Sequence, residues 1–150
     1  MLTKHLAFAA LGVMLSIPAL TGVAGAGDTR VLVAYLTGSN ELPALGDPDA
    51  FGSATVTLVS PTSLCFTLAV QNLGGAATAA HIHTGDPSVA GGVFVPLAVN
   101  ATAPFRIANC IPAVAAATIT ALRSNPNGFY VNVHSAAFGA GAVRGQLRAE

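Results

Sequence analysis

Hydrophobic and polar residues alternate over several short stretches of this chain, and Gly, Pro and Asp residues separate the stretches. Alternation with a period of two is typical of strands that bury one face. The pattern predicts strands over residues 30–37, 53–59, 64–70, 78–84, 93–99, 129–135 and 143–148. Many short strands with turns at this spacing predict an antiparallel sandwich or barrel and argue against a parallel α/β sheet.

Three stretches depart from this alternation. Pro96 lies inside the stretch 93–99, and because proline cannot donate to a ladder we expect that strand at an edge or a bulge. Residues 111–123 are rich in alanine and space their larger side chains as a helix does, which predicts one short helix before Asn125-Pro126-Asn127-Gly128. Residues 38–52 contain several Gly and Pro residues and are expected to be irregular.

Residues 1–26 have the organisation of an export signal. Lys4 and His5 precede an apolar run over 6–20, and Ala24-Gly25-Ala26 has the small-x-small form of a cleavage site. We predict a signal peptide over 1–26, a mature domain over 27–150, and a secreted or periplasmic location. The alternative is an uncleaved anchor, since an apolar run of about 20 residues can span a bilayer.

Charge is scarce and balanced over the chain. Six Lys and Arg residues stand against six Asp and Glu residues, and charged residues make up 8% of the sequence. Such a domain lacks the basic face that binds nucleic acid and the polybasic run that binds anionic lipid. We therefore expect no nucleic-acid partner and no membrane insertion after signal cleavage. An extracellular protein or a cell-surface polymer is the expected kind of partner.

The mature chain has two cysteines, Cys65 and Cys110. In an exported protein an even number of cysteines favours a disulfide. Two buried free thiols, or two thiolate metal ligands, are the alternatives at this point.

The histidines carry the most specific candidate chemistry. Beyond the leader they are His81, His83 and His134. In a strand His81 and His83 project from one face with their Cα atoms about 6.5 to 7 Å apart, while Ile82 points the other way. If the strand with His134 lies beside them, three imidazole nitrogens converge, which suits Zn²⁺ or Cu²⁺. Asp86 is a candidate fourth ligand or outer partner.

Other kinds of site are weaker candidates. The histidines can also serve purely structural roles, with Asn132, Glu41 or backbone carbonyls fixing their tautomers. Three histidines are too few for a binuclear copper–zinc centre. Ser135 adjoins His134 but faces the opposite way in a strand, and no nucleophile elbow is present. No pattern brings Glu41 to an aspartate as a glycosidase pair. An enzyme is therefore not the expected function.

Four separated segments together resemble one family, the CHRD domain, named after chordin. They are Leu36-Thr37-Gly38-Ser39-Asn40-Glu41-Leu42-Pro43, Ala80-His81-Ile82-His83-Thr84-Gly85, Tyr130-Val131-Asn132-Val133-His134-Ser135 and Val143-Arg144-Gly145-Gln146-Leu147. The resemblance implies a secreted or periplasmic all-β domain, an antiparallel immunoglobulin-like or superoxide-dismutase-like β-sandwich, of the bacterial single-domain type. One departure is Ala142, where family members commonly carry an acidic residue.

Within these matched segments Glu41 and Arg144 are predicted to form a structural ion pair at one end of the sandwich. The expected function is a secreted, non-enzymatic CHRD-type binding module. The alternative function is a mononuclear Cu or Zn protein that uses His81, His83 and His134.

Overall fold

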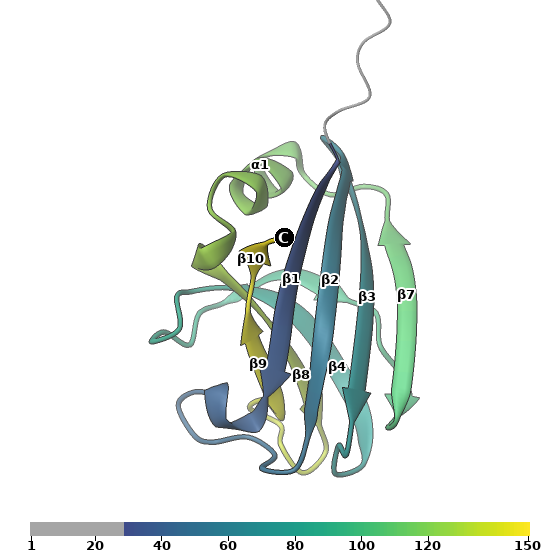
Figure 1. Cartoon of the computed structure of the whole chain (residues 1–150), viewed down its shortest axis with the longest axis vertical. Coiled ribbons are helices and arrows are strands. Elements are labelled where there is room, and N and C mark those ends of the chain that lie inside the picture. The colour runs from purple at the N-terminus through teal and green to yellow at the C-terminus, as the bar shows by residue number, and fades with distance from the viewer. Residues whose placement is uncertain (1–28) are drawn as a thin grey trace, which may run out of the picture.

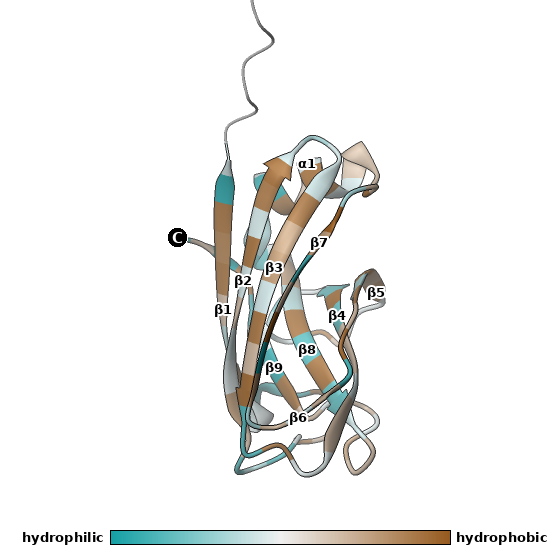
Figure 2. Ribbon diagram, turned by 90° about the vertical axis from the view of Figure 1, so that its right-hand side faces the viewer, coloured by the Kyte–Doolittle hydropathy of each residue, from teal (hydrophilic) through white to brown (hydrophobic). Residues whose placement is uncertain are grey.

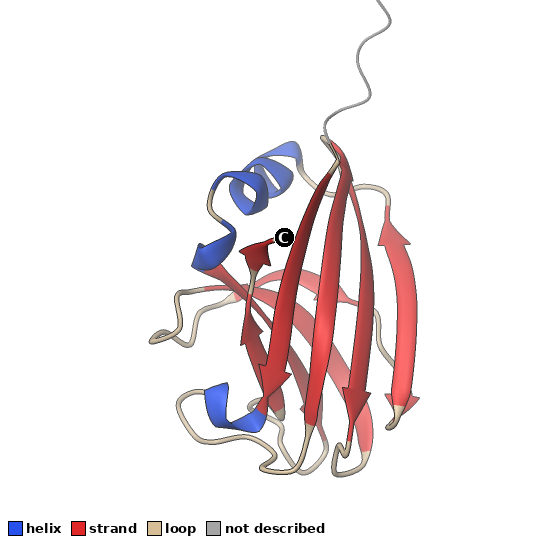
Figure 3. Cartoon of the chain, viewed as in Figure 1, coloured by secondary structure: helices blue, strands red, loops and turns tan. Residues whose placement is uncertain are grey.

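The computed structural model describes residues 29–150, and the predicted signal peptide lies outside the described residues. One α-helix and two short 3-10 turns accompany the strands (Figure 1, Figure 3). The elements are β1 (Arg30–Thr37), η1 (Gly38–Asn40), β2 (Phe51–Ser60), β3 (Ser63–Gln71), β4 (Ala76–Thr84), β5 (Val93–Leu97), β6 (Ala101–Thr102), β7 (Phe105–Ile111), α1 (Ala116–Ser124), η2 (Pro126–Gly128), β8 (Phe129–Ser135), β9 (Val143–Gln146) and β10 (Arg148–Ala149).

The strands form one antiparallel sheet in the order β5-β4-β8-β9-β1-β2-β3-β7, while β10 pairs with β1 and β6 with β4. Strands β1, β2, β3 and β7 lie side by side as one layer, and β4, β8 and β9 run behind them (Figure 1). The two layers meet where Thr37 of β1 pairs with Arg144 of β9. The all-β prediction with one short helix is confirmed, and the sandwich consists of a single sheet that curls over on itself.

The core lies between the two halves of this curled sheet. Apolar residues recur along the strands, as the brown bands in Figure 2 show, and alternation directs their side chains into the core. Ile119 and Leu122 of α1 are also buried, so the helix packs its apolar side against the same core. The largest fully buried apolar side chains are Leu32, Leu36, Leu58, Leu64, Leu68, Ile82, Leu122, Leu147, Val56, Val70 and Val131.

Two expectations about elements need correction. The strand β7 was not predicted, although its apolar Phe105, Ile107 and Ile111 alternate with more exposed residues. These apolar side chains are only partly buried, because β7 ends the sheet, and so its pattern is weaker than that of the inner strands. The helix is also shorter than the alanine-rich stretch and occupies only Ala116–Ser124. By contrast β5, which contains Pro96, lies at the other edge as expected.

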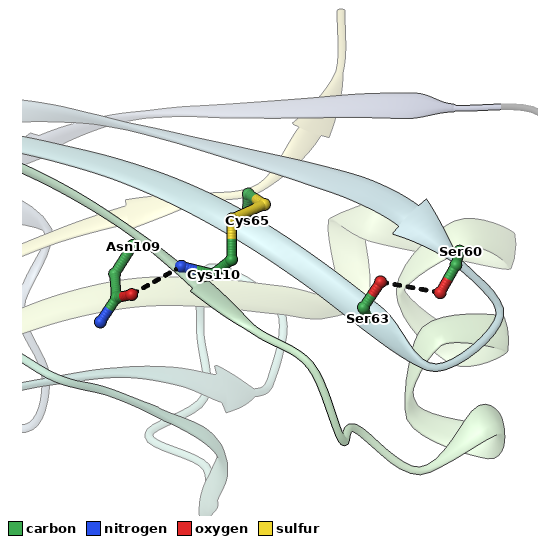
Figure 4. Close-up of a disulfide and its surroundings, with 5 residues drawn as sticks. All are labelled: Ser60, Ser63, Cys65, Asn109 and Cys110. Carbon is green, nitrogen blue, oxygen red and sulfur yellow. Dashed lines mark hydrogen bonds between the residues drawn. A yellow bond between two sulfur atoms is a disulfide. The ribbon is translucent and has the colours of Figure 1, made fainter.

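The predicted disulfide is present. Cys65 on β3 and Cys110 on β7 are directly opposite in the register and their sulfurs are bonded (Figure 4). The bridge attaches the edge strand β7 to its neighbour across a sequence separation of 45 residues. A disulfide is typical of an oxidising, extracytoplasmic environment. Among the described residues no helix has the length and apolar character needed to span a bilayer.

Candidate functional site: a histidine cluster on a polar sheet face

Strands β4, β8 and β9 have two faces of different chemistry. One face sends apolar side chains such as Ile82, Val131 and Val133 into the core. The other carries the alternate positions, which are polar or aromatic, and teal bands alternate with brown ones along β8 (Figure 2). We call this second face the polar face; it consists of His81, His83, Tyr130, Asn132, His134, Arg144 and Gln146.

The register arranges the polar face in rows. In the first row His81 of β4 is opposite Asn132 of β8, and Asn132 is opposite Arg144 of β9. Directly opposite residues on antiparallel strands have Cβ atoms about 4.5 to 5.5 Å apart, so neighbours in a row can contact each other. The second row consists of His83, Tyr130 and Gln146.

The loop between β4 and β5 folds over this face. The Nη2 group of Arg144 donates hydrogen bonds to the carbonyl oxygens of Asp86, at 2.8 Å, and Val89, at 3.0 Å. The backbone N–H of Gly91 donates to the hydroxyl of Tyr130 at 3.2 Å. The guanidinium carbon of Arg144 also lies 3.5 Å from the centre of the Tyr130 ring, a close cation–π contact. As a result Arg144 is only 2% exposed.

A second loop, residues 38–47, lies against β9 at Arg144. The side-chain amide of Asn40 donates to the Arg144 carbonyl, and the following residue, Glu41, is buried. The Glu41 carboxyl lies against Gly141, where an added Cβ would collide with it and where the positive φ of 148° also favours glycine. The backbone therefore makes room for a buried acidic side chain at this point.

The three histidines come together on the polar face. The Nδ1 atom of His81 lies 3.1 Å from Nε2 of His134, and one nitrogen from each of the three rings lies within 4.8 Å of the others. Nitrogen ligands of a tetrahedral zinc ion, each about 2.0 to 2.1 Å from the metal, are about 3.4 Å apart. The nitrogens of His81 and His134 already lie near this spacing, and the nitrogen of His83 lies within 4.8 Å of both.

Backbone carbonyls fix the tautomers of two of the rings. Nδ1 of His83 lies 2.9 Å from the carbonyl oxygen of Gly91, and Nδ1 of His134 lies 3.0 Å from that of Gly139. A carbonyl can only accept, so each Nδ1 carries the proton and each Nε2 keeps its lone pair. Nε2 of His83 is buried and has no hydrogen-bond partner within residues 29–150. Two imidazoles thus present a lone pair, as a metal ligand must.

The environment also favours neutral imidazoles. Burial lowers the pKa of His81, and the neighbouring His134 and His83 lower it further by like-charge repulsion. Burial likewise lowers the pKa of His134, although its bond to Gly139 acts in the opposite direction. Because a protonated imidazole cannot bind a metal, these shifts leave the cluster competent for binding at neutral pH.

Asp86 lies apart from this cluster. Its carboxylate accepts hydrogen bonds from the backbone N–H and the hydroxyl of Ser88, which hold the pKa of Asp86 below its usual value. The group of potential ligands consists of the three histidines and does not include Asp86. The carboxylate therefore shapes the loop, and its placement gives no support to the role of fourth ligand.

Glu41 and Arg144 are both buried, and their charges interact. Burial raises the pKa of Glu41 to about 7, while the charge of Arg144, the N–H of Leu42 and the side chain of Asn132 act to lower it. The hydrogen bonds of the Arg144 guanidinium go to backbone carbonyls. The charge interaction supports the expected ion pair, which itself stays a prediction.

The residues of the alternative glycosidase and hydrolase sites have structural surroundings. The carboxylate of Asp47 accepts hydrogen bonds from the backbone N–H groups of Asp49 and Gly74, so it holds two loops together. The hydroxyl of Ser135 is buried and has no hydrogen-bond partner in the part of the chain that the structure describes. Neither residue joins the polar face.

Sequence reasoning found the histidines but missed the polar face as a unit. Alternation places Tyr130 and Asn132 on the same strand face as His134, but it assigns no role at the site to Tyr130 or Gln146. The signal was present as period-two spacing, since Tyr130, Asn132 and His134 alternate, and so do Arg144 and Gln146. What the sequence lacked was the pairing of β8 with both β4 and β9.

Residues 32–147 match the CHRD domain family. The match covers most of the chain and includes every residue of the polar face, so the protein belongs to the CHRD domain family. No curated protein and no solved structure matches the chain significantly.

Proposed function

We propose that this CHRD domain is an extracytoplasmic, non-enzymatic binding module and that its polar face binds one Zn²⁺ or Cu²⁺ ion through His81, His83 and His134. The observation that carries the proposal is the convergence of one nitrogen from each histidine within 4.8 Å. Imidazole suits both metals, and Cu²⁺ binds more tightly than Zn²⁺ at most nitrogen sites.

The surroundings of the histidines support this proposal further. Nδ1–H of His83 and of His134 donates to a backbone carbonyl, which is the outer-shell arrangement that orients histidine ligands in metal proteins. The ring of His83 also stacks on Tyr130, with 4.9 Å between centroids and 8° between planes, so its orientation is fixed before any ion arrives. A preorganised ligand loses less conformational entropy on binding.

The loop between β4 and β5 is where we place contact with an extracellular protein or cell-surface polymer. Val89 in this loop is 46% exposed, and Val93 at the start of β5 is 56% exposed. Both lie in or next to the segment that holds Gly91 against His83. A partner bound there would contact the same loop that orients the metal ligand.

The mature domain, expressed with its disulfide and without a histidine tag, tests the metal proposal. Elemental analysis after exposure to Zn²⁺ or Cu²⁺ and dialysis should find one ion per chain, and calorimetry should give a saturable isotherm. His83→Ala should weaken binding at least about 100-fold, because it removes one of three ligands. The control is Asp86→Ala, which should change affinity less than about threefold, since its carboxylate is held by Ser88.

Two results together would refute the proposal. They are an absence of bound Zn and Cu in the wild-type protein and an affinity for added metal that His83→Ala leaves unchanged. Equal losses from His83→Ala and Asp86→Ala would show that the carboxylate is a ligand after all.

A further inference from the structure

The outer shell of the histidine cluster is complete for two rings and incomplete for the third. His83 and His134 each direct Nδ1–H to a backbone carbonyl, that of Gly91 or Gly139. The corresponding contact of His81 runs to another ring, because its Nδ1 faces Nε2 of His134. If Nδ1 of His81 binds a metal, its proton must reside on Nε2, and this N–H then needs an acceptor.

Asn132 has the right position and chemistry to be that acceptor. It stands directly opposite His81 on the neighbouring strand and is 2% exposed. Its Oδ1 atom is buried and has no hydrogen-bond partner among the described residues. A buried carbonyl without a donor is costly, so a role for it is to be expected.

We infer that Asn132 is a positioning residue for the metal site proposed above: its Oδ1 accepts the Nε2–H of His81 and thereby turns the Nδ1 lone pair of His81 towards the ion. This inference rests on the proposed function. It completes a common pattern in which the non-ligating nitrogen of each histidine donates to a carbonyl oxygen, from Gly91, Gly139 or Asn132.

The protons balance in this arrangement. In the metal-free protein Nε2 of His134 has a lone pair, so the 3.1 Å contact is a hydrogen bond when Nδ1 of His81 carries the proton. This tautomer is in equilibrium with the Nε2–H tautomer, whose N–H Asn132 accepts. Binding of an ion requires His81 to move that proton from Nδ1 to Nε2, which solvent exchange accomplishes without a net release of protons. The amide oxygen of Asn132 then accepts the relocated N–H.

In this arrangement Glu41 is the group that orients the amide of Asn132. The side chain of Asn132 acts to lower the pKa of Glu41, as expected when its NH₂ group donates towards the carboxyl. An amide has its donor and acceptor on opposite sides, so an NH₂ group directed at Glu41 leaves Oδ1 free for the strand on the other side. Glu41 thus orients Asn132, and Asn132 orients His81.

Calorimetry with Zn²⁺ on the mature, disulfide-bonded domain tests the inference. Asn132→Ala should lower affinity about 10- to 100-fold, the usual effect of losing an outer-shell partner, while the stoichiometry stays at one ion per chain. Ser135→Ala is the matched control, because it removes a buried unpartnered polar atom from the same strand and should leave affinity unchanged. If the wild-type protein binds Zn²⁺ and Asn132→Ala binds it with the same affinity, the inference is overturned. The proposed function is then unaffected.

A second measurement does not depend on metal. Nitrogen NMR of the metal-free protein reports the tautomer of His81, and Asn132→Ala should reduce its Nε2–H population about fivefold, the value of one hydrogen bond. The double variant Asn132→Asp with Glu41→Gln exchanges the acid and the amide, keeps an acceptor oxygen beside His81, and should restore both the tautomer and the affinity. An unchanged tautomer in Asn132→Ala, or no recovery in the double variant, would overturn the inference. Failure of the wild-type protein to bind Zn²⁺ would instead refute the proposed function.

Discussion

The outer faces of the two halves of the sheet differ in what they do with polar side chains. On the β1–β2–β3–β7 half the outer face meets solvent, and Tyr35 there is 68% exposed. On the β4–β8–β9 half the outer face lies under two loops, and Asn132 and Arg144 are each 2% exposed. Solvent can satisfy the polar groups of the first face, whereas the second must satisfy them internally or leave them unpaired.

The second face leaves several of them unpaired. Among the described residues, the buried side-chain atoms without a hydrogen-bond partner include Nε2 of His83, Oδ1 of Asn132 and Nη1 of Arg144. A group of such atoms on one face of one sheet is costly for folding. This half of the sheet therefore buries unpaired polar groups at a cost to stability, a pattern that is typical of functional sites.

The largest loss of stability is expected when Arg144 on the buried polar face is replaced. Arg144→Ala removes the donors to two loop carbonyls and the charge beside Glu41, and a one-sided change of this kind costs about 3 to 5 kcal/mol when the groups are fully desolvated. Urea unfolding should show a lower midpoint with an unchanged slope. A melting temperature within a degree of the wild-type value would mean that the buried face does not depend on this residue.

The second-largest loss of stability is expected when the disulfide of the solvent-facing half is removed. Replacing Cys65 and Cys110 by serine removes a cross-link over 45 residues, which costs about 4 kcal/mol in the chain-entropy model, within the range expected for Arg144→Ala. The melting temperature should fall by roughly 15 °C. Metal affinity should stay the same in the folded double variant, because the bridge lies between β3 and β7. A loss of metal binding would show that the two halves are coupled.

The sequence predicted inner strands of the sheet better than its edge at β7. Alternation placed β1 at Arg30–Thr37 and β8 at Phe129–Ser135 with the observed bounds, because one buried side and one polar side produce a clear period of two. The strand β7 escaped prediction because its position at the edge leaves its apolar residues partly exposed.

For the site, the sequence predicted which histidines share a face but not what surrounds them. His81 and His83 follow from spacing within one strand, and their meeting with His134 was conditional on strand order. The roles of Asn132 and Glu41 depend on pairing between strands and on a loop that folds back, which are contacts between distant segments. No local pattern encodes such contacts, so only the fold reveals them.

The third effect is a pH dependence from Glu41. Its pKa is about 7 in the folded protein against 4.5 in the unfolded chain, so the folded state holds its proton more tightly. The stability from this group is therefore fully present below pH 4.5 and is lost as pH rises towards and through 7, by on the order of 3 kcal/mol. The lowered pKa values of His81 and His134 act in the opposite direction.

Glu41→Gln isolates this contribution. The difference in unfolding free energy between the wild-type protein and Glu41→Gln, measured by urea titration at intervals from pH 4.5 to 8, cancels the histidine contributions. The unfolding free energy of Glu41→Gln should increase relative to that of the wild-type protein as the pH rises. A difference that is constant over this range would show that Glu41 titrates normally.

The smallest loss of stability is expected for Arg148→Ala, which is the matched control for Arg144→Ala. Arg148 also lies over a tyrosine, with its guanidinium carbon 5.0 Å from the centre of the Tyr35 ring, but both side chains are exposed. A cation–π contact in water is worth about 0.5 to 1 kcal/mol, so Arg148→Ala should lower the unfolding free energy by no more than this. Urea unfolding of the two alanine variants side by side compares the same pair of residue types in two environments. Equal losses would show that burial under the loops adds nothing, and the contrast between the two faces would then lose its energetic basis.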